Sequence, residues 1–352
     1  MRIRLLALMM AGGALLAPPA SAQDTLSRDA AAQARAALHE ARTAVRDALR
    51  EALPRAYQGH GGPEQTERFS RRIKIGKDGS VSISNVSGTI VVTGGGGDEV
   101  VLDAVKRTRG DRSELNSIAI DVDDRGGRVD VRVRHFGRTD QASVDFTVTV
   151  PASAAVDLKS VSGDVKISNV DGPARVESVS GNVTASAVPK VEVAKSVSGD
   201  VTLTGASANG DLTASSVSGN VNAKGVKARS LDLGTVSGDV SVTDASCERL
   251  NARSVSGNLE FSGALARGGR YDVNSHSGTV RLTLAGDTGF ELNATSFSGS
   301  IRSELPLTIG GDDRRDGRRR GLNEHSIHGT FGDGSAMLTV RTFSGDVVIA
   351  KR

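Results

Sequence analysis

The polar residues best able to do chemistry recur at regular intervals from residue 164 onward. The residue that follows the Ser-Gly pair alternates between acid and amide in six successive copies, and the next two copies have Thr279 and Ser300; the six are Asp164, Asn182, Asp200, Asn220, Asp239 and Asn258. Carboxylate and amide oxygens suit Ca²⁺, so one interpretation is a calcium-binding ladder. The calcium-binding nonapeptide has a Gly-Gly-x-Gly-x-Asp spacing, which this chain lacks. We therefore favour a structural turn ladder, in which alternation limits like-charge repulsion and each Asn hydrogen bonds to its neighbours.

A charged insertion separates the last two Ser-Gly pairs, at Gly299 and Gly345, by 46 residues. It is predicted as a loop over residues 310–325. Five arginines in it could form an interaction loop for a polyanion such as lipopolysaccharide phosphate, because Arg binds such groups bidentately; they are Arg314, Arg315, Arg318, Arg319 and Arg320. A solvated loop is the simpler interpretation of so polar a run.

Other candidate reactive groups are sparse. His325 and His328 could ligate a metal, but no Cys or third His lies near them in the sequence, so we predict no metal site. Cys247 has no partner for a disulfide and is read as a small buried residue. No Gly-x-Ser-x-Gly or His-Glu-x-x-His motif occurs. The sequence therefore predicts a protein that is not an enzyme, with no catalytic residues and no cofactor.

The elements that hold these residues form a repeat. Ten Ser-Gly pairs place glycines at Gly88, Gly163, Gly181, Gly199, Gly219, Gly238, Gly257, Gly278, Gly299 and Gly345, with intervals of 18 to 21 residues between Gly163 and Gly299. Apolar residues alternate on both sides of each pair, as in Leu231-x-Leu233 and Val240-x-Val242, which indicates two half-buried strands joined at a glycine of positive φ. Glu192, flanked by Val191 and Val193, predicts a bulge.

A fixed period near 19 residues indicates one unit stacked many times. We predict an all-β protein, a single-stranded, right-handed β-solenoid with coils of about 19 residues and an N-terminal α-helix. Equivalent residues would form ladders, including an apolar one from Val161 to Val255 that ends in His276, Phe297 and Phe343. The solenoid is expected over residues 156–352, with residues 69–155 as an irregular β capping region that protects its end.

The N-terminal part is predicted to be built differently. Residues 1–22 have the basic start, the apolar run and the Ala20-Ser21-Ala22 site of a signal peptide. The run from Leu5 to Ala17 is too short to span a membrane, so no transmembrane segment is expected in the mature chain. Residues 23–58 are predicted as an Ala/Arg-rich amphipathic helix and residues 59–68 as a linker.

Charge and composition limit the partners. The chain has 44 Lys and Arg against 41 Asp and Glu, no Trp, and aromatic residues at 3%. A nucleic-acid-binding protein would show a basic field and stacking aromatics, so we predict no nucleic-acid partner. The partner is expected to be an unidentified envelope or surface protein or glycan.

Three sets of residues resemble a known family: the repeated Ser-Val-Ser-Gly-Asp-Val units, the turn at 85–90, and the closing turn at 342–347. They resemble the bacterial "putative adhesin" family, domain of unknown function 4097, over residues 69–350. The resemblance implies a role in the cell envelope or at the surface, and it supplies no catalytic residues or ligand.

Three hypotheses remain open from the sequence. The first is an exported adhesin-like module located in the periplasm, at the outer cell surface or outside the cell. The second is a periplasmic scaffold or accessory protein in envelope-stress signalling, with the predicted helix binding the partner. The third and weakest is a polysaccharide-active enzyme, which would need paired carboxylates in a cleft.

Overall fold

The computed structural model describes residues 64–136, 142–308 and 325–352. The chain divides into two units, Met1–Gly61 and Gly62–Arg352, and only the second contains described residues. The predicted signal peptide, the helix at 23–58 and Arg314 to Arg320 lie outside the described residues. In the part that the structure describes, the one helix is a 3-10 turn, Arg112–Ser117, and no helix is long and apolar enough to cross a membrane.

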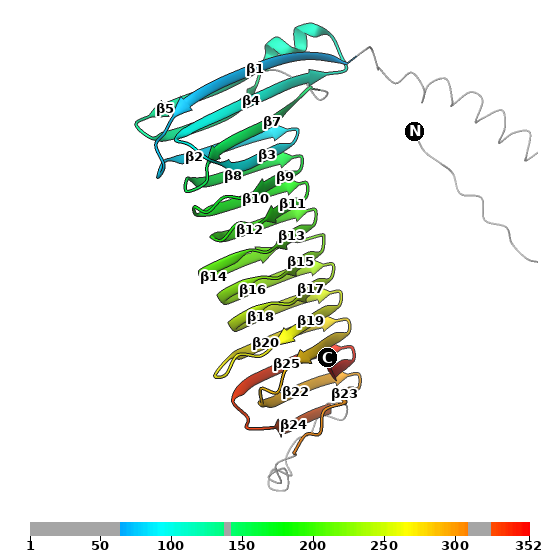
Figure 1. Cartoon of the computed structure of the whole chain (residues 1–352). Coiled ribbons are helices and arrows are strands. Elements are labelled where there is room, and N and C mark those ends of the chain that lie inside the picture. Colours follow the sequence, from blue (N-terminus) through cyan, green and yellow to red (C-terminus); the bar gives the residue numbers. More distant parts are fainter. Residues whose placement is uncertain (1–63, 137–141, 309–324) are drawn as a thin grey trace, which may run out of the picture. The chain divides into compact units, whose positions relative to one another are not determined.

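The described unit is all-β, as predicted, and its strands form two sheets of 13 strands each. Each coil gives one strand to each sheet, and the Ser-Gly corner joins the two strands (Figure 1). The coil strands are β8 (Ala155–Ser162), β9 (Val165–Ser168), β10 (Ala174–Ser180), β11 (Val183–Ser186), β12 (Val191–Ser198), β13 (Val201–Thr204), β14 (Ser207–Ser215), β15 (Val221–Lys224), β16 (Lys227–Ser237), β17 (Val240–Thr243), β18 (Ser246–Ser256), β19 (Leu259–Ala264), β20 (Arg270–Ser277) and β21 (Val280–Ala285).

The core lies between the two sheets and is built from stacked aliphatic residues. Along one sheet Val165, Val183, Val201, Val221 and Val240 pair in register, and each is at most 1% exposed. The period-two alternation of the sequence places these side chains inward and their neighbours outward. Parallel pairing repeats the contact at every coil, so the core needs little aromatic bulk.

Two coils contain irregularities in the strand pairing. At the predicted bulge, Ala174 pairs with Val191 and Arg175 with Val193, so Glu192 is the additional residue. A second irregularity lies between Ala208 and Asp211 of β14. Both leave the Ser-Gly corners in register, because the shifts occur before the corner.

The N-terminal residues extend both sheets with strands whose outermost pairs are antiparallel. These are β1 (Gln65–Lys74), β4 (Glu99–Thr108) and β7 (Ala142–Pro151) in one sheet, and β5 (Ile118–Arg125) and β6 (Arg128–His135) in the other. Between them and β8–β9 lies a regular coil made of β2 (Ser80–Ser87) and β3 (Ile90–Gly95). Parallel pairing therefore continues beyond this coil to β6 and β7, and the antiparallel strands β1, β4 and β5 close the end.

The C-terminal residues depart from the order of the sequence. The remaining strands are β22 (Phe290–Ser298), β23 (Ile301–Ser303), β24 (His325–Phe331), β25 (Ala336–Ser344) and β26 (Val347–Lys351). The coil β25–β26 lies between β20–β21 and β22–β23, so the last coil of the chain is the penultimate one in space (Figure 1). Strand β24 then pairs antiparallel with the outer edge of β22.

Candidate functional site

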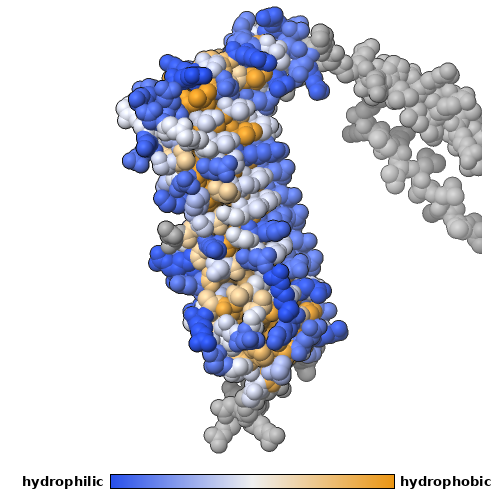
Figure 2. Space-filling model, viewed as in Figure 1, coloured by the Kyte–Doolittle hydropathy of each residue, from blue (hydrophilic) through white to orange (hydrophobic). Residues whose placement is uncertain are grey.

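The most distinctive surface is a row of exposed apolar side chains beside the Ser-Gly corners. We call it the apolar stripe. In spatial order it consists of Val86, Val161, Val179, Val197, Val217, Val236, Val255, His276, Phe343 and Phe297. Its valines are 39–51% exposed. Its ten residues lie on adjacent strands spaced by about 4.8 Å, so the stripe is about 43 Å long. Figure 2 shows one face of the stacked coils, on which apolar residues lie among hydrophilic ones.

The stripe ends in three stacked rings. The ring centroids of His276 and Phe343 are 4.9 Å apart with an interplanar angle of 8°, and those of Phe343 and Phe297 are 4.8 Å apart at 5°. The sequence grouped these three residues, and the structure places Phe343 in the middle because β25 lies between β20 and β22. Both faces of the Phe343 ring are covered by its neighbours, so the ring presents its edge outward.

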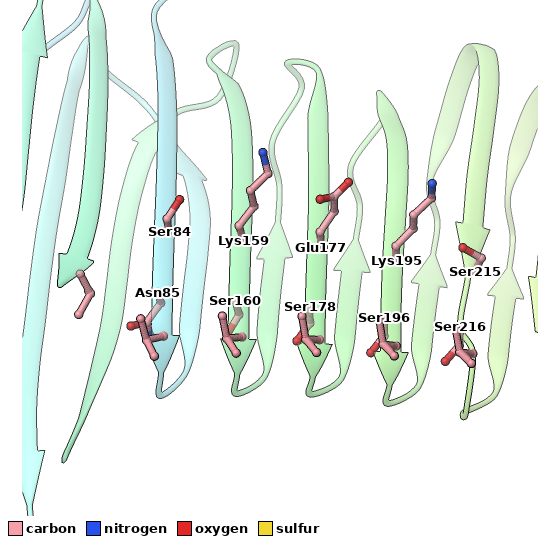
Figure 3. Close-up of a pocket in the computed structure, with 16 residues that line it drawn as sticks. Ser84, Asn85, Lys159, Ser160, Glu177, Ser178, Lys195, Ser196, Ser215 and Ser216 are labelled. Carbon is pink, nitrogen blue, oxygen red and sulfur yellow. The ribbon is translucent and has the colours of Figure 1, made fainter. Parts of the chain in front are cut away.

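A groove of about 610 Å³ runs along the N-terminal half of the stripe. Its lining includes valines of the stripe, Val133 of β6, and an adjacent row of longer side chains (Figure 3). In that row Glu177 pairs with Lys159 on one side and Lys195 on the other. The same row continues through Arg253 and Arg341. It holds four cations and one anion, so this side of the stripe is net positive by three charges.

The ten corner glycines are placed at points where adjacent coils touch. A Cβ built on each would lie 1.9–2.3 Å from a backbone carbonyl oxygen of the neighbouring coil or strand. Seven of the ten also have positive φ, for example +106° at Gly88 and +140° at Gly163. Gly181, Gly199 and Gly219 are not among the positive-φ glycines. The prediction of positive φ at every corner is therefore wrong for three glycines. What all ten glycines share is a neighbouring carbonyl oxygen too close to leave room for a Cβ.

The residue three before each corner glycine is buried, and in six coils its hydroxyl joins one coil to the next. Ser196 Oγ donates to the Gly181 carbonyl at 2.8 Å, and Ser216 Oγ donates to that of Gly199 at 2.8 Å. The first coil uses Asn85, whose Nδ2 donates to the Val144 carbonyl at 2.8 Å. In these coils the accepting carbonyl is the one that lies close to the corner glycine. The hydroxyls of Ser160, Ser275 and Thr342 make no hydrogen bond within the described residues.

The Asp/Asn column also connects coils rather than gathering oxygens around an ion. The side-chain oxygen of Asp164 accepts the backbone N–H of Asn182 at 2.9 Å, and that of Asn182 accepts the N–H of Asp200 at 2.9 Å. The pattern continues to Thr279, whose N–H binds Asn258 Oδ1 at 3.0 Å. Among the described residues no cluster of three potential ligands is found. This geometry is a turn ladder, the interpretation favoured from the sequence.

The remaining candidate residues are not brought together. His325 and His328 lie on strand β24, not on a loop, and pair with Ser296 and Asn293. Residues three apart on a strand face opposite sides, so they do not form a ligand pair. Cys247 is buried, and burial raises the pKa of its thiol to about 11. Its backbone carbonyl accepts a hydrogen bond from Tyr271 Oη at 2.8 Å.

A family model named Toastrack, DUF4097, matches residues 174–350, half of the chain. The chain belongs to the Toastrack family. The match runs from the first residue of β10 into β26, so the Toastrack region includes the coil that is out of order. The resemblance read from the sequence began at residue 69, whereas the Toastrack match leaves the N-terminal strands and first two coils outside it.

Three solved structures resemble the chain. They are a "putative cell adhesion protein" from Clostridium sporogenes (9% identity, 82% of this chain and 100% of that chain, TM-score 0.21), a "putative adhesin" from Bacteroides fragilis (12%, 80% and 97%, 0.40) and another from Parabacteroides merdae (12%, 83% and 98%, 0.32). At these TM-scores the likeness says nothing about the function of this chain. No curated protein matches it.

The sequence missed the groove and the positive border of the stripe. Val133 belongs to β6, far from the repeat in sequence, and it joins the groove because β6 pairs with β2. The charged residues of this row stand two positions before the stripe residues in the sequence. Because side chains on a strand alternate between its two faces, they lie on the same face as the stripe, and the sequence could have shown this.

Proposed function

We propose that this protein is an exported, non-enzymatic interaction module of the cell envelope or surface, which binds an extended partner protein along the apolar stripe. The exposed row from Val86 to Phe297 is the single observation that carries the proposal. Contiguous apolar surface on a soluble fold is characteristic of an interaction site. The ten stripe residues would each make a weak contact, and together these contacts would raise the affinity for a partner that lies along the stripe.

The chemistry of the stripe favours a protein partner over a glycan. Sugars are bound by the flat faces of aromatic rings, and stacking covers both faces of Phe343 and one face each of His276 and Phe297. Valine side chains and ring edges fit apolar side chains. The neighbouring cations, including Lys159 and Lys195, favour a partner segment that also carries acidic residues.

A binding experiment with matched variants tests the stripe. In one full-length variant, Val179, Val197 and Val217 are replaced by Lys. In the control, Thr184, Thr202 and Asn222 on the other sheet of the same coils are replaced by Lys. The chains are tested against immobilised surface and matrix proteins. We expect the stripe variant to lose binding and the control to retain it; equal binding by both variants would show that the stripe is not the binding face.

The cellular location needs a separate experiment. Cells expressing the full chain are fractionated, and protease is added to intact cells. We expect degradation in intact cells, which supports a surface module. Protection until the outer membrane is opened would instead support the periplasmic accessory protein. Incubation of the chain with a polysaccharide panel, with release of reducing ends as the readout, tests the enzyme hypothesis; release of sugar would overturn the non-enzymatic proposal.

A further inference from the structure

The out-of-order coil at the C-terminus places two equivalent coils in competition for one position. Strand β25 pairs with β20 from Arg270↔Met337 to Ser277↔Ser344, and on its other side it pairs with β22 from Phe290↔Ala336 to Ser298↔Ser344. Because β22 and β20 use the same residues of β25 in the same register, β22 has the alignment needed to pair with β20 directly.

The two coils also share the features that a place beside β20–β21 requires. A Cβ on Gly345 would lie 2.1 Å from the Gly278 carbonyl oxygen, so only a glycine can stack there. The β22–β23 coil offers Gly299 at the equivalent position. Its Ser296 corresponds to Thr342, and its Phe297 corresponds to Phe343. Two coils, β22–β23 and β25–β26, therefore have the residues needed to stack against Gly278.

The order of synthesis gives the β22–β23 coil the earlier opportunity. Residues 290–303 precede residues 336–351 by more than 30 positions, and chains fold progressively as they are made. Once β22–β23 stacks on β20–β21, the last coil can reach its place only by entering between two paired coils.

The final arrangement is favoured by longer pairing. Strand β26 pairs with β21 over five residues, from Val280↔Val347 to Leu284↔Lys351, whereas β23 contains three residues. Val347 and Ile349 are fully buried, while Ile301 is half-buried. Arg352 adds an ion pair with Asp244, 2.5 Å between Nη1 and Oδ1, and its backbone N–H binds the Leu284 carbonyl at 2.9 Å.

We propose that β25–β26 is an insertion element, which displaces β22–β23 from β20–β21 and moves it one place outward. The same arm of the chain, residues 325–352, then holds the displaced strand on both edges, with β25 on one side and β24 on the other. The fold thus has a sequence-order state and an inserted state, and the structure is the inserted one.

Cysteine pairs in the full chain distinguish the two states. Ser277, Ser298 and Ser344 are exposed and occupy equivalent positions in the three coils. Adjacent strands are about 4.8 Å apart, within the Cα separation of a disulfide. The pair S277C/S344C reports the inserted state, and S277C/S298C reports the sequence-order state. S237C/S256C, on coils paired in both states, is the positive control, and S256C/S344C, two rungs apart, is the negative control.

The chains are synthesised in vitro and oxidised at successive times during and after synthesis. We expect the S277C/S298C product to appear first and then to decline, while the S277C/S344C product rises to the level of the positive control. Absence of the S277C/S298C product at every time would overturn the proposal. So would an S277C/S344C product that links two molecules, because the inserted coil would then come from a second copy.

A full-length variant that blocks insertion gives an independent measurement. V347D places a carboxylate at a buried position between β21 and β23. We expect the S277C/S298C product to persist in this variant and the S277C/S344C product to be lost. If the S277C/S344C product still dominates, β22–β23 does not compete for the position and the proposal is wrong.

Discussion

At the residue scale, the Ser-Val-Ser-Gly corner combines one close approach, one buried hydrogen bond and one exposed side chain. The glycine lets a neighbouring carbonyl come within a distance that any Cβ would prevent. In coils such as that of Ser196 the inward serine donates to that carbonyl, and the valine between the two serines points outward into the stripe. Each position of the motif therefore has a different physical reason, and substitutions at them should have separable effects.

Replacing a corner glycine should destabilise the solenoid strongly. In Gly199→Ala the new Cβ would meet the Gly181 carbonyl oxygen at 2.3 Å, and backbone must move to relieve the contact. We expect a loss of about 2–4 kcal/mol in the free energy of unfolding, measured with denaturant. Gly210→Ala is the matched control, because a Cβ there meets nothing within 4 Å. A similar loss in both variants would contradict the role of close approach.

Each inward serine should contribute to the free energy of unfolding only if its hydroxyl makes a hydrogen bond. Ser196→Ala removes the 2.8 Å bond to the Gly181 carbonyl and should cost about 1 kcal/mol. Ser160 occupies the equivalent position, but its hydroxyl makes no hydrogen bond within the described residues. We expect Ser160→Ala to change the unfolding midpoint much less than Ser196→Ala. The reverse order would show that the hydroxyl acts through packing instead.

At the element scale, the C-terminal coil depends on an acidic contact that should respond to pH. Hydrogen bonds from the backbone N–H and the hydroxyl of Ser300, both 2.8 Å, lower the pKa of Asp346 below its usual 3.8. A lowered pKa in the folded state means that the ionised group favours folding above pH 3.8. This contribution is lost as the pH falls below that value through the folded-state pKa.

Asp346→Asn should weaken this acid sensitivity. The amide keeps an oxygen that can accept both bonds from Ser300, and it does not titrate. We expect the variant to resemble the parent in thermal unfolding at pH 7 and to lose less stability between pH 4 and pH 2. An unchanged difference between the two pH values would show that Asp346 does not contribute to the acid response.

At the scale of the whole described unit, each coil contacts only its two neighbours along the column. The free energy of unfolding is then close to the sum of the stability of each coil and of each interface between adjacent coils, as in other repeat proteins. Leu203 lies in β13, is fully buried, and pairs with Ala185 of β11 and Ala223 of β15. A substitution of Leu203 should therefore destabilise mainly its own coil and the two coils beside it.

Leu203→Ala should cost about 2–5 kcal/mol because it leaves a cavity in the core. We expect amide hydrogen exchange to accelerate mainly in β11, β13 and β15, and much less in β4 and β25. Val161→Ala, at a 51% exposed stripe position, is the control and should leave exchange unchanged. Uniform acceleration along the whole column would indicate a single cooperative core.

The repeating chemistry of this protein could be predicted from its sequence, because each rule acts within one coil or between equivalent residues. The period of two placed Val165 and Ile167 inward, the flanking valines marked the bulge at Glu192, and the alternation of Asp with Asn pointed to a hydrogen-bonded column. The recurring glycines indicated the corners. Local spacing was sufficient for each of these features.

The tertiary structure alone decided the order in which the coils stack. Nothing in the corner Ser296-Phe297-Ser298-Gly299 distinguishes its place from that of Thr342-Phe343-Ser344-Gly345, since both meet the same steric requirement. The 46-residue interval between them signalled an interruption but not an exchange of places. The outcome depends on pairing length and burial summed over β23 and β26, and those are properties of neighbours in space. For the same reason, the order of the three stacked rings that end the stripe, and the groove completed by Val133, could not be derived from the sequence.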